Sequence, residues 1–235
     1  MNSKFSGLRV LEIRNYLLKP NLTNIFSKYF HQHFVTPMSE LKGYTLGEFA
    51  ISGTDNRFVW FRGFTDMKSR LQFLNDFYIK SEVWKKFGKA ANEMMINSDN
   101  VYLLKPLYEN EFIISDKEIT AIDFYICNNT IERTISLFER EFIPYLRSIQ
   151  LTDISFWISE MTENDFPRLP VFQDKNLLLS ITNYASKKEF ETLQPQVKEM
   201  PESLNTSLLK LVTIHNNLTL VNLNYKNSMN KGTGL

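Results

Sequence analysis

The sequence predicts an α+β fold in which the two halves of one chain repeat the element order β-α-β-β-α-β. Short stretches alternate apolar and polar residues with period two, which is typical of strands. Longer stretches between them place apolar residues at helical spacing. Both kinds of stretch recur in the same order and at similar spacing in the second half. Eight strands are expected, at residues 8–18, 44–52, 57–64, 100–106, 119–127, 153–161, 177–184 and 218–224.

The first half begins with a strand whose faces differ in chemistry. In residues 8–18 one face carries Val10, Glu12, Arg14 and Tyr16. A helix rich in phenylalanine follows, and then come two strands joined by a short turn and a second helical region. Asp66 precedes that second helical region. We expect Asp66 to cap it and to pair with Arg70 four residues later.

The second half matches the first at several positions. Its opening strand places Tyr125 where the first half has Tyr16, and Asp123 where the first half has Arg14. The following helix repeats the Phe-x-x-x-Phe spacing of the first. The main difference is a longer loop at residues 162–175, which carries apolar residues such as Phe166 and Phe172.

This element order is that of the ferredoxin-like split unit, in which both helices cover one sheet face and the strand order is 4-1-3-2. We expect one repeat at residues 1–107, a divergent second repeat at 118–225 and a flexible tail at 226–235. The bare faces of the two sheets would carry Val10, Tyr16 and either Trp60 or Phe61. Because a bare apolar face is an association site, the two sheets are expected to pair inside one chain as a pseudo-dimeric α/β barrel. Further association into a homo-oligomer stays open.

Composition excludes several classes of function. The chain has 235 residues and a formal net charge of +1, so nothing in its charge favours a nucleic-acid partner. Cys127 is its only cysteine, which rules out internal disulfides and cysteine-based metal clusters. There is no signal-peptide stretch and no apolar run long enough to span a membrane. We therefore expect a cytoplasmic protein without metal or cofactor.

Four stretches together resemble the NIPSNAP family of the dimeric α/β-barrel superfamily: "LEIRNYLLKP" (11–20), "GEFAISGTDNRFVWFRGFTDMKSR" (47–70), "FYIKSEVWKKFGKAANEMM" (77–95) and "SDNVYLLKP" (98–106). They cover most of the first half, whereas the second half matches by pattern only. The resemblance implies the barrel fold. It implies little about chemistry, because the superfamily includes cofactor-independent monooxygenases, haem-degrading enzymes, lactone isomerases and binding proteins. Haem would need an axial ligand, and no histidine is well placed to provide one.

Charged residues on the central strands are the main candidates for a site. Glu12 and Arg14 share a strand face, as do Trp60 and Arg62. The first and third strands are neighbours in this fold, so a cross-strand carboxylate–guanidinium contact is within reach. One interpretation is a structural ion pair. The other places Arg62 in the barrel cavity, where it would bind an anionic oxygen beside aromatic walls.

The expected ligand-binding residues are Arg14, Tyr16, Trp60, Arg62, Asp123 and Tyr125. A catalytic base is less defined: Glu12, Glu48, Asp123 and His33 are the options, with Arg14 and Arg62 as further weak catalytic candidates. Because Arg14 and Asp123 carry opposite charges at matching positions, we expect an asymmetric site built mainly from the first half.

Three functions remain open. The first is the binding of a small apolar or aromatic molecule in the barrel cavity. The second is cofactor-independent monooxygenation of a phenol, quinol or polyketide-like substrate. The third is a scaffold that contacts proteins through loop 162–175, although that loop could also pack over the barrel.

Overall fold

The computed structural model describes residues 7–108, 117–128 and 130–224, and the expected tail lies outside these ranges. Eight strands form a closed barrel in the order β1-β3-β2-β8-β5-β7-β6-β4. They are β1 (Val10–Leu18), β2 (Tyr44–Ile51), β3 (Arg57–Phe64), β4 (Met95–Pro106), β5 (Ile119–Cys127), β6 (Ile154–Ser159), β7 (Leu177–Tyr184) and β8 (Val212–Asn222). The predicted α+β class and the barrel are therefore confirmed.

Each half of the chain contributes four adjacent strands to the barrel. The first half supplies β4-β1-β3-β2 and the second supplies β8-β5-β7-β6. Antiparallel pairing of β2 with β8 and of β4 with β6 joins the two sets. The closure that we expected from two bare sheet faces is thus achieved within one chain.

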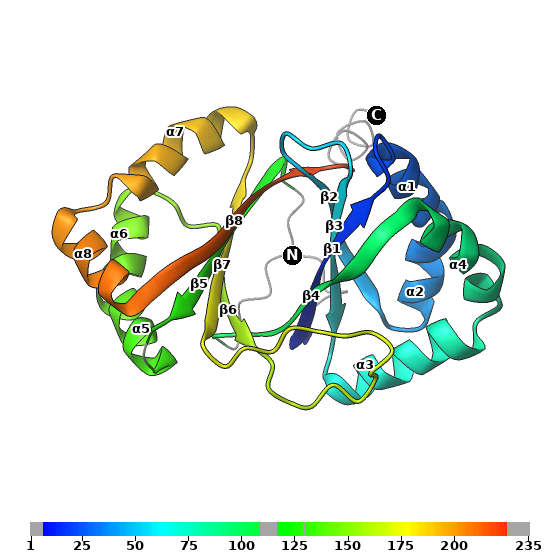
Figure 1. Cartoon of the computed structure of the whole chain (residues 1–235). Helices are drawn as coiled ribbons and strands as arrows, with labels where there is room; N and C mark the ends of the chain where they lie inside the picture. The colour runs from blue at the N-terminus through cyan, green and yellow to red at the C-terminus, as the bar shows by residue number, and fades with distance from the viewer. Residues whose placement is uncertain (1–6, 109–116, 129, 225–235) are drawn as a thin grey trace, which may run out of the picture.

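Helices cover the outside of the barrel in two groups (Figure 1). The first group holds α1 (Thr23–Phe30), α2 (Thr36–Glu40), α3 (Met67–Leu74) and α4 (Glu82–Met94). The second holds α5 (Ile131–Leu137), α6 (Ile143–Ser148), α7 (Lys187–Lys198) and α8 (Glu202–Leu211). Wide π-helical turns continue α1 into α2, extend α3 and continue α5 into α6; they span His31–Val35, Asn75–Lys80 and Phe138–Phe142.

Three apolar clusters show which face of the sheet points into the barrel and which face the helices cover. One cluster draws on both halves, with residues such as Leu11, Phe61 and Phe124, and it lines the barrel interior. Each of the others lies between one half of the barrel and its helices. Both faces of the central strands are therefore buried.

This burial corrects the predicted face assignment. Val10, Tyr16 and Trp60 belong to the cluster beneath the first helices, whereas Phe61 points into the barrel. Alternation separates the two faces of a strand, but it cannot say which face the helices cover when both faces are apolar.

Candidate functional site

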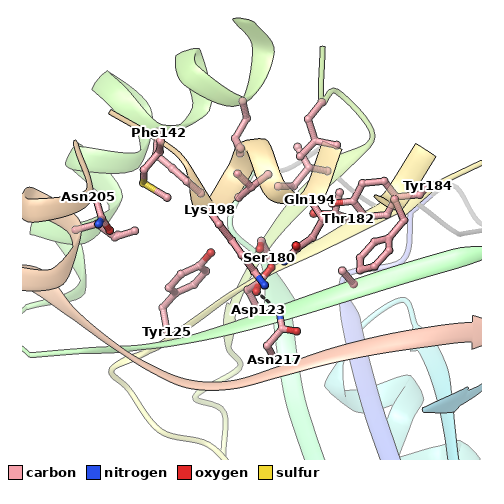
Figure 2. A pocket seen from close by; sticks show the side chains of 18 of the residues that line it. Asp123, Tyr125, Phe142, Ser180, Thr182, Tyr184, Gln194, Lys198, Asn205 and Asn217 are labelled. Atoms are coloured by element: carbon pink, nitrogen blue, oxygen red, sulfur yellow. Dashed lines mark hydrogen bonds between the residues drawn. The ribbon is translucent and has the colours of Figure 1, made fainter. Parts of the chain in front are cut away.

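A cavity of about 390 Å³ lies between the second-half strands and their helices, and Figure 2 shows its lining. That volume falls within the range of small-molecule sites. Strands β5 and β7 form its floor with Ala121, Asp123, Tyr125, Ser180, Thr182 and Tyr184. Residues of α6, α7 and α8, together with Phe142, form its walls, and most of them are apolar.

Part of the floor is open because two cross-strand pairs of its side chains are small. In the first half, β1 and β3 pair Arg14 with Trp60. At the matching cross-strand position of the second half, β5 and β7 pair Asp123 with Ser180. Replacing an indole by a hydroxymethyl group removes most of the volume that would fill this space.

The neighbouring cross-strand pair shows the same reduction in size. Glu12 faces Arg62 in the first half, whereas Ala121 faces Thr182 in the second. Since all four second-half residues line the cavity, the void is a property of this pair of strands.

Asp123 is the acidic group of the cavity. Its carboxylate accepts a hydrogen bond from the side chain of Asn217 on β8, and Figure 2 shows Lys198 of α7 pointing to the same region. Burial raises the pKa of Asp123, and the bond from Asn217 and the charge of Lys198 only partly offset that effect. A carboxylate with a raised pKa in a mostly apolar cavity has the properties of a general base.

Two phenol groups share the cavity floor. Burial raises the pKa of Tyr125 and of Tyr184, and the charge of Asp123 raises both further. Both hydroxyls therefore stay protonated near neutral pH and are able to donate hydrogen bonds to a ligand oxygen.

The first-half candidates form a different arrangement. Glu12, Arg14 and Arg62 are buried between the sheet and the helices, not in the barrel interior. Glu12 accepts from Arg62 Nε at 2.8 Å and from Arg14 Nη1 at 3.0 Å. The ion pair that the sequence suggested is therefore present, and Arg62 lies beneath the helices instead of in the barrel cavity of the alternative interpretation.

Tyr16 and Trp60 belong to this buried cluster. The hydroxyl of Tyr16 accepts a hydrogen bond from Arg14 Nε at 2.9 Å. The guanidinium of Arg62 lies 5.1 Å from the centre of the Trp60 ring, which is cation–π distance. These contacts join side chains of the protein to each other and involve no ligand. The binding role of Tyr16 and Trp60 therefore stays a prediction.

Arg70 is a member of the cluster that the sequence did not indicate. We expected it to pair with Asp66 on the helix surface, but it is fully buried and donates from Nε to Glu12 at 2.7 Å. Asp66 does cap α3, as predicted, and accepts from Ser69 N at 2.6 Å. The signal that was available is the helical spacing of Arg70 with Phe73 and Leu74, which are also buried.

The other possible bases are occupied. Glu48 is buried, lies 2.8 Å from His31 Nδ1 and accepts from Ser27 at 3.3 Å. His33 stacks on Phe87 with 4.0 Å between ring centres, at the edge of the first-half core. Of the four groups proposed as bases, Asp123 is the one in a described cavity. We expected the first half to supply most of the site, and this cavity lies in the second.

Solved structures provide the comparison with known proteins, since no protein-family model and no curated protein matches the chain. A candidate monooxygenase from Fusobacterium nucleatum superposes with a TM-score of 0.61 and 7% identity, over 93% of this chain and 94% of its own. An anthrone oxidase-like protein superposes with a TM-score of 0.56 and 9% identity, over 94% and 93%. Identities this low show a shared fold and nothing more.

Similar structures also include the NIPSNAP proteins that the sequence resembles. A NIPSNAP family protein of unknown function from Agrobacterium tumefaciens matches 46% of this chain and 96% of its own, with 17% identity and a TM-score of 0.41. It corresponds in length to about one half of the barrel, and a score this low supports no inference about the site.

Within the described residues, no helix is long and apolar enough to cross a membrane.

Proposed function

We propose that the chain binds a small apolar or aromatic molecule in the second-half cavity. The observation that carries this proposal is the substitution of small residues for large ones on β5 and β7. Ser180 stands opposite Asp123 where the first half has Trp60 opposite Arg14. The walls suit an apolar body, and Asp123, Tyr125 and Tyr184 suit one polar substituent.

A Ser180→Trp variant tests the proposal by filling the cavity as Trp60 fills the first half. The probe is 1-naphthol, an aromatic ring system with one hydroxyl, and its affinity is measured by isothermal titration calorimetry. We expect wild type to bind 1-naphthol and Ser180→Trp to bind at least tenfold more weakly. Ser136→Trp, on the exposed side of α5, is the control and is expected to bind as wild type does.

Circular dichroism checks that Ser180→Trp is folded, and Ala121→Leu is a smaller filling variant if it is not. Equal affinity in wild type and a folded filling variant would contradict the proposed location. Native mass spectrometry of protein taken directly from cells adds an independent readout, because a retained small molecule should be present in wild type and absent from Ser180→Trp.

Cofactor-independent monooxygenation is the second candidate, and Asp123 is the observation that favours it. A base in an apolar cavity can take a proton from an activated CH₂ group flanked by aromatic rings. The resulting carbanion is electron-rich enough to react with O₂. The balanced reaction converts the CH₂ group and O₂ into a carbonyl group and water.

Anthrone is a suitable first substrate because an anthrone oxidase-like protein shares the fold. Oxygen uptake with anthrone measures the reaction. We expect Asp123→Asn to lower the rate by about 10²-fold or more, the usual contribution of a general base. If no oxygen is consumed above the buffer rate, anthrone is not a substrate of this chain, and the first proposal is tested separately by the binding of 1-naphthol.

We further propose that the two sets of strands are ferredoxin-like repeats with boundaries at residues 1–107 and 118–225. The matching strand orders of the two halves support this assignment. A cytoplasmic location and assembly into a homo-oligomer are also proposals, which fractionation of cells and light scattering of purified protein would test.

A further inference from the structure

Three arginines and one glutamate are buried together beneath the first group of helices. Arg14, Arg62, Arg70 and Glu12 are each at most 1% exposed. Guanidinium groups remain charged in proteins. Three positive charges therefore face one negative charge, and such an excess is costly to bury without a further anion.

One of the two terminal nitrogens of Arg70 makes a hydrogen bond within the described part of the chain, and the other does not. Its Nε donates to Glu12, and its Nη1 donates to Asn164 Oδ1 at 3.0 Å. Its Nη2 is buried and has no hydrogen-bond partner among the described residues. A carboxylate usually binds such a fork through two parallel bonds, but here an amide oxygen occupies one side of it.

A second carboxylate stands close without completing this geometry. Asp165 Oδ1 lies 3.9 Å from Arg70 Nη1, and the Asp165 side chain is 41% exposed. This distance is beyond a hydrogen bond. Asp165 therefore offsets part of the excess charge without satisfying Nη2.

The residue after Asp165 fills an aromatic pocket in the first half. Phe166 is 7% exposed and belongs to the cluster beneath the first helices. Its ring centre lies 6.5 Å from that of Tyr78. Figure 1 shows this loop reaching from β6 and β7 across to α3. A segment of the second half thus places a carboxylate and an aromatic ring, in adjacent residues, on the first half.

We propose that Arg70 is the anchor of a second binding site, for an arylalkyl carboxylic acid, and that Asp165 and Phe166 occupy this site as an internal substitute for the ligand. The ligand carboxylate takes Nη1 and Nη2 of Arg70 together, and its ring replaces that of Phe166. Phe172 remains fixed by backbone bonds to Val101 and Leu103 on β4, so only the loop tip has to move.

Binding of 3-phenylpropanoate to the full chain tests the proposal, measured by isothermal titration calorimetry. Removing the internal occupant with Asp165→Ala/Phe166→Ala should tighten binding at least tenfold, because the ligand no longer competes with the loop. Phe172→Ala is the matched control: its side chain is 52% exposed in the same loop, and its affinity should equal that of wild type.

Two further measurements identify the anchor and the location. In the Asp165→Ala/Phe166→Ala background, Arg70→Lys should weaken binding at least tenfold, and the neutral 3-phenyl-1-propanol should bind at least tenfold more weakly than the acid. The alcohol comparison remains informative if Arg70→Lys does not fold. Adding Ser180→Trp should leave the affinity unchanged, which separates this site from the second-half cavity.

Three results would overturn the proposal: no binding of 3-phenylpropanoate by the double variant at 10 mM, equal binding of acid and alcohol, or loss of binding with Ser180→Trp. The last would move the acid to the second-half cavity and would leave the first proposed function intact.

Discussion

Glu12 is the carboxylate that offsets the cost of burying three arginines in the first half of the folded chain. Burial alone would raise its pKa, but the charges of Arg62, Arg70 and Arg14 outweigh burial and lower the pKa well below the ordinary value of 4.5. Glu12 is therefore ionised throughout the physiological range. It contributes stability above its unfolded pKa that is lost only as the pH falls toward the lowered folded pKa.

Glu12→Gln is expected to be severely destabilising because it leaves Arg14 and Arg62 without a carboxylate and leaves Arg70 with only the half-exposed Asp165, at 3.9 Å. The expected loss is about 3–5 kcal/mol in the free energy of unfolding, measured by urea denaturation at pH 7. Glu82→Gln is the matched control, since the side chain of Glu82 is 86% exposed and pairs with Lys85 on the surface. A loss below about 1 kcal/mol for Glu12→Gln would mean that the arginines find other anions.

Asp123 has the opposite linkage to pH. Its folded pKa is raised above the ordinary 3.8, so the folded state holds the proton more tightly than the unfolded state does. Its contribution is favourable below pH 3.8 and is lost as the pH rises through the folded pKa. Asp123→Asn should therefore be more stable than wild type at pH 7, and this advantage should shrink toward pH 4.

Thermal unfolding between pH 4 and pH 7 measures that difference. Asp99→Asn, in an exposed part of β4, is the control and is expected to show no such trend. A constant difference between Asp123→Asn and wild type across this range would show that the carboxylate is not destabilised by burial.

For single residues, the sequence predicted which charged side chains pair with each other better than it predicted where in the fold a side chain or a cavity lies. The Glu12–Arg62 pair followed from strand order and the need of a buried guanidinium for a carboxylate. Arg70 was missed because helical spacing also allows a surface pair with Asp66. The cavity was missed because it depends on Ser180 and Thr182, two small residues whose significance appears only beside Trp60 and Arg62.

Among the elements, α3 begins with the most complete cap. Asp66 accepts from Ser69 N, and Ser69 Oγ accepts from Asp66 N at 3.1 Å, which forms a reciprocal capping box. The cap fixes the start of the helix that carries Arg70. Local rules were sufficient to predict it from sequence, since the interaction spans four residues.

Asp66→Ala should lower the free energy of unfolding by about 1 kcal/mol, the usual cost of losing an N-cap. Asp66→Asn should retain most of the stability because asparagine also caps well. Urea denaturation of both variants measures the effect, and equal losses for alanine and asparagine would point to the charge instead of the cap.

The π-helical turns are a feature that helical residue spacing did not predict. Two of them lie at matching places in the halves, His31–Val35 and Phe138–Phe142. The sequence predicted helix in both regions through the Phe-x-x-x-Phe spacing. It could not predict the wider turn, because one extra residue in a helical turn depends on what the flanking phenylalanines pack against.

For the whole molecule, the strand order and the internal closure followed from the repeated element order. Which face would line the barrel did not follow, because Tyr16 and Phe61 are equally apolar in pattern and both are buried. The path of loop 162–175 also depends on contacts far apart in sequence, such as Arg70 with Asn164.

The barrel has two unequal kinds of strand contact. β1 pairs with β3 from residue 10 to residue 17, whereas the ladder of β2 with β8 covers Phe49, Ala50 and Ile51, with one further backbone bond at each end, from Ser52 N to Thr219 O and from Leu223 N to Glu48 O. The contact between β4 and β6 is equally short, at Leu104, Lys105 and Pro106. Short ladders give few hydrogen bonds that must break together.

Amide hydrogen exchange should therefore proceed faster at Ala50 and Ser52, which face β8, than at Ile13 and Val59. Mass spectrometry of peptides from the exchanged protein measures this order. Equal protection at the short and long ladders would show that the barrel opens only by unfolding as a whole.

Because the two halves of the barrel meet at β2–β8 and at β4–β6, a second copy of the chain can supply the same strand partners at these two seams. If both seams open together, the first half of one chain can pair with the second half of another through the same residue pairs. At high concentration the protein would then exchange halves between chains, and each swapped dimer would keep every strand partner of the monomer.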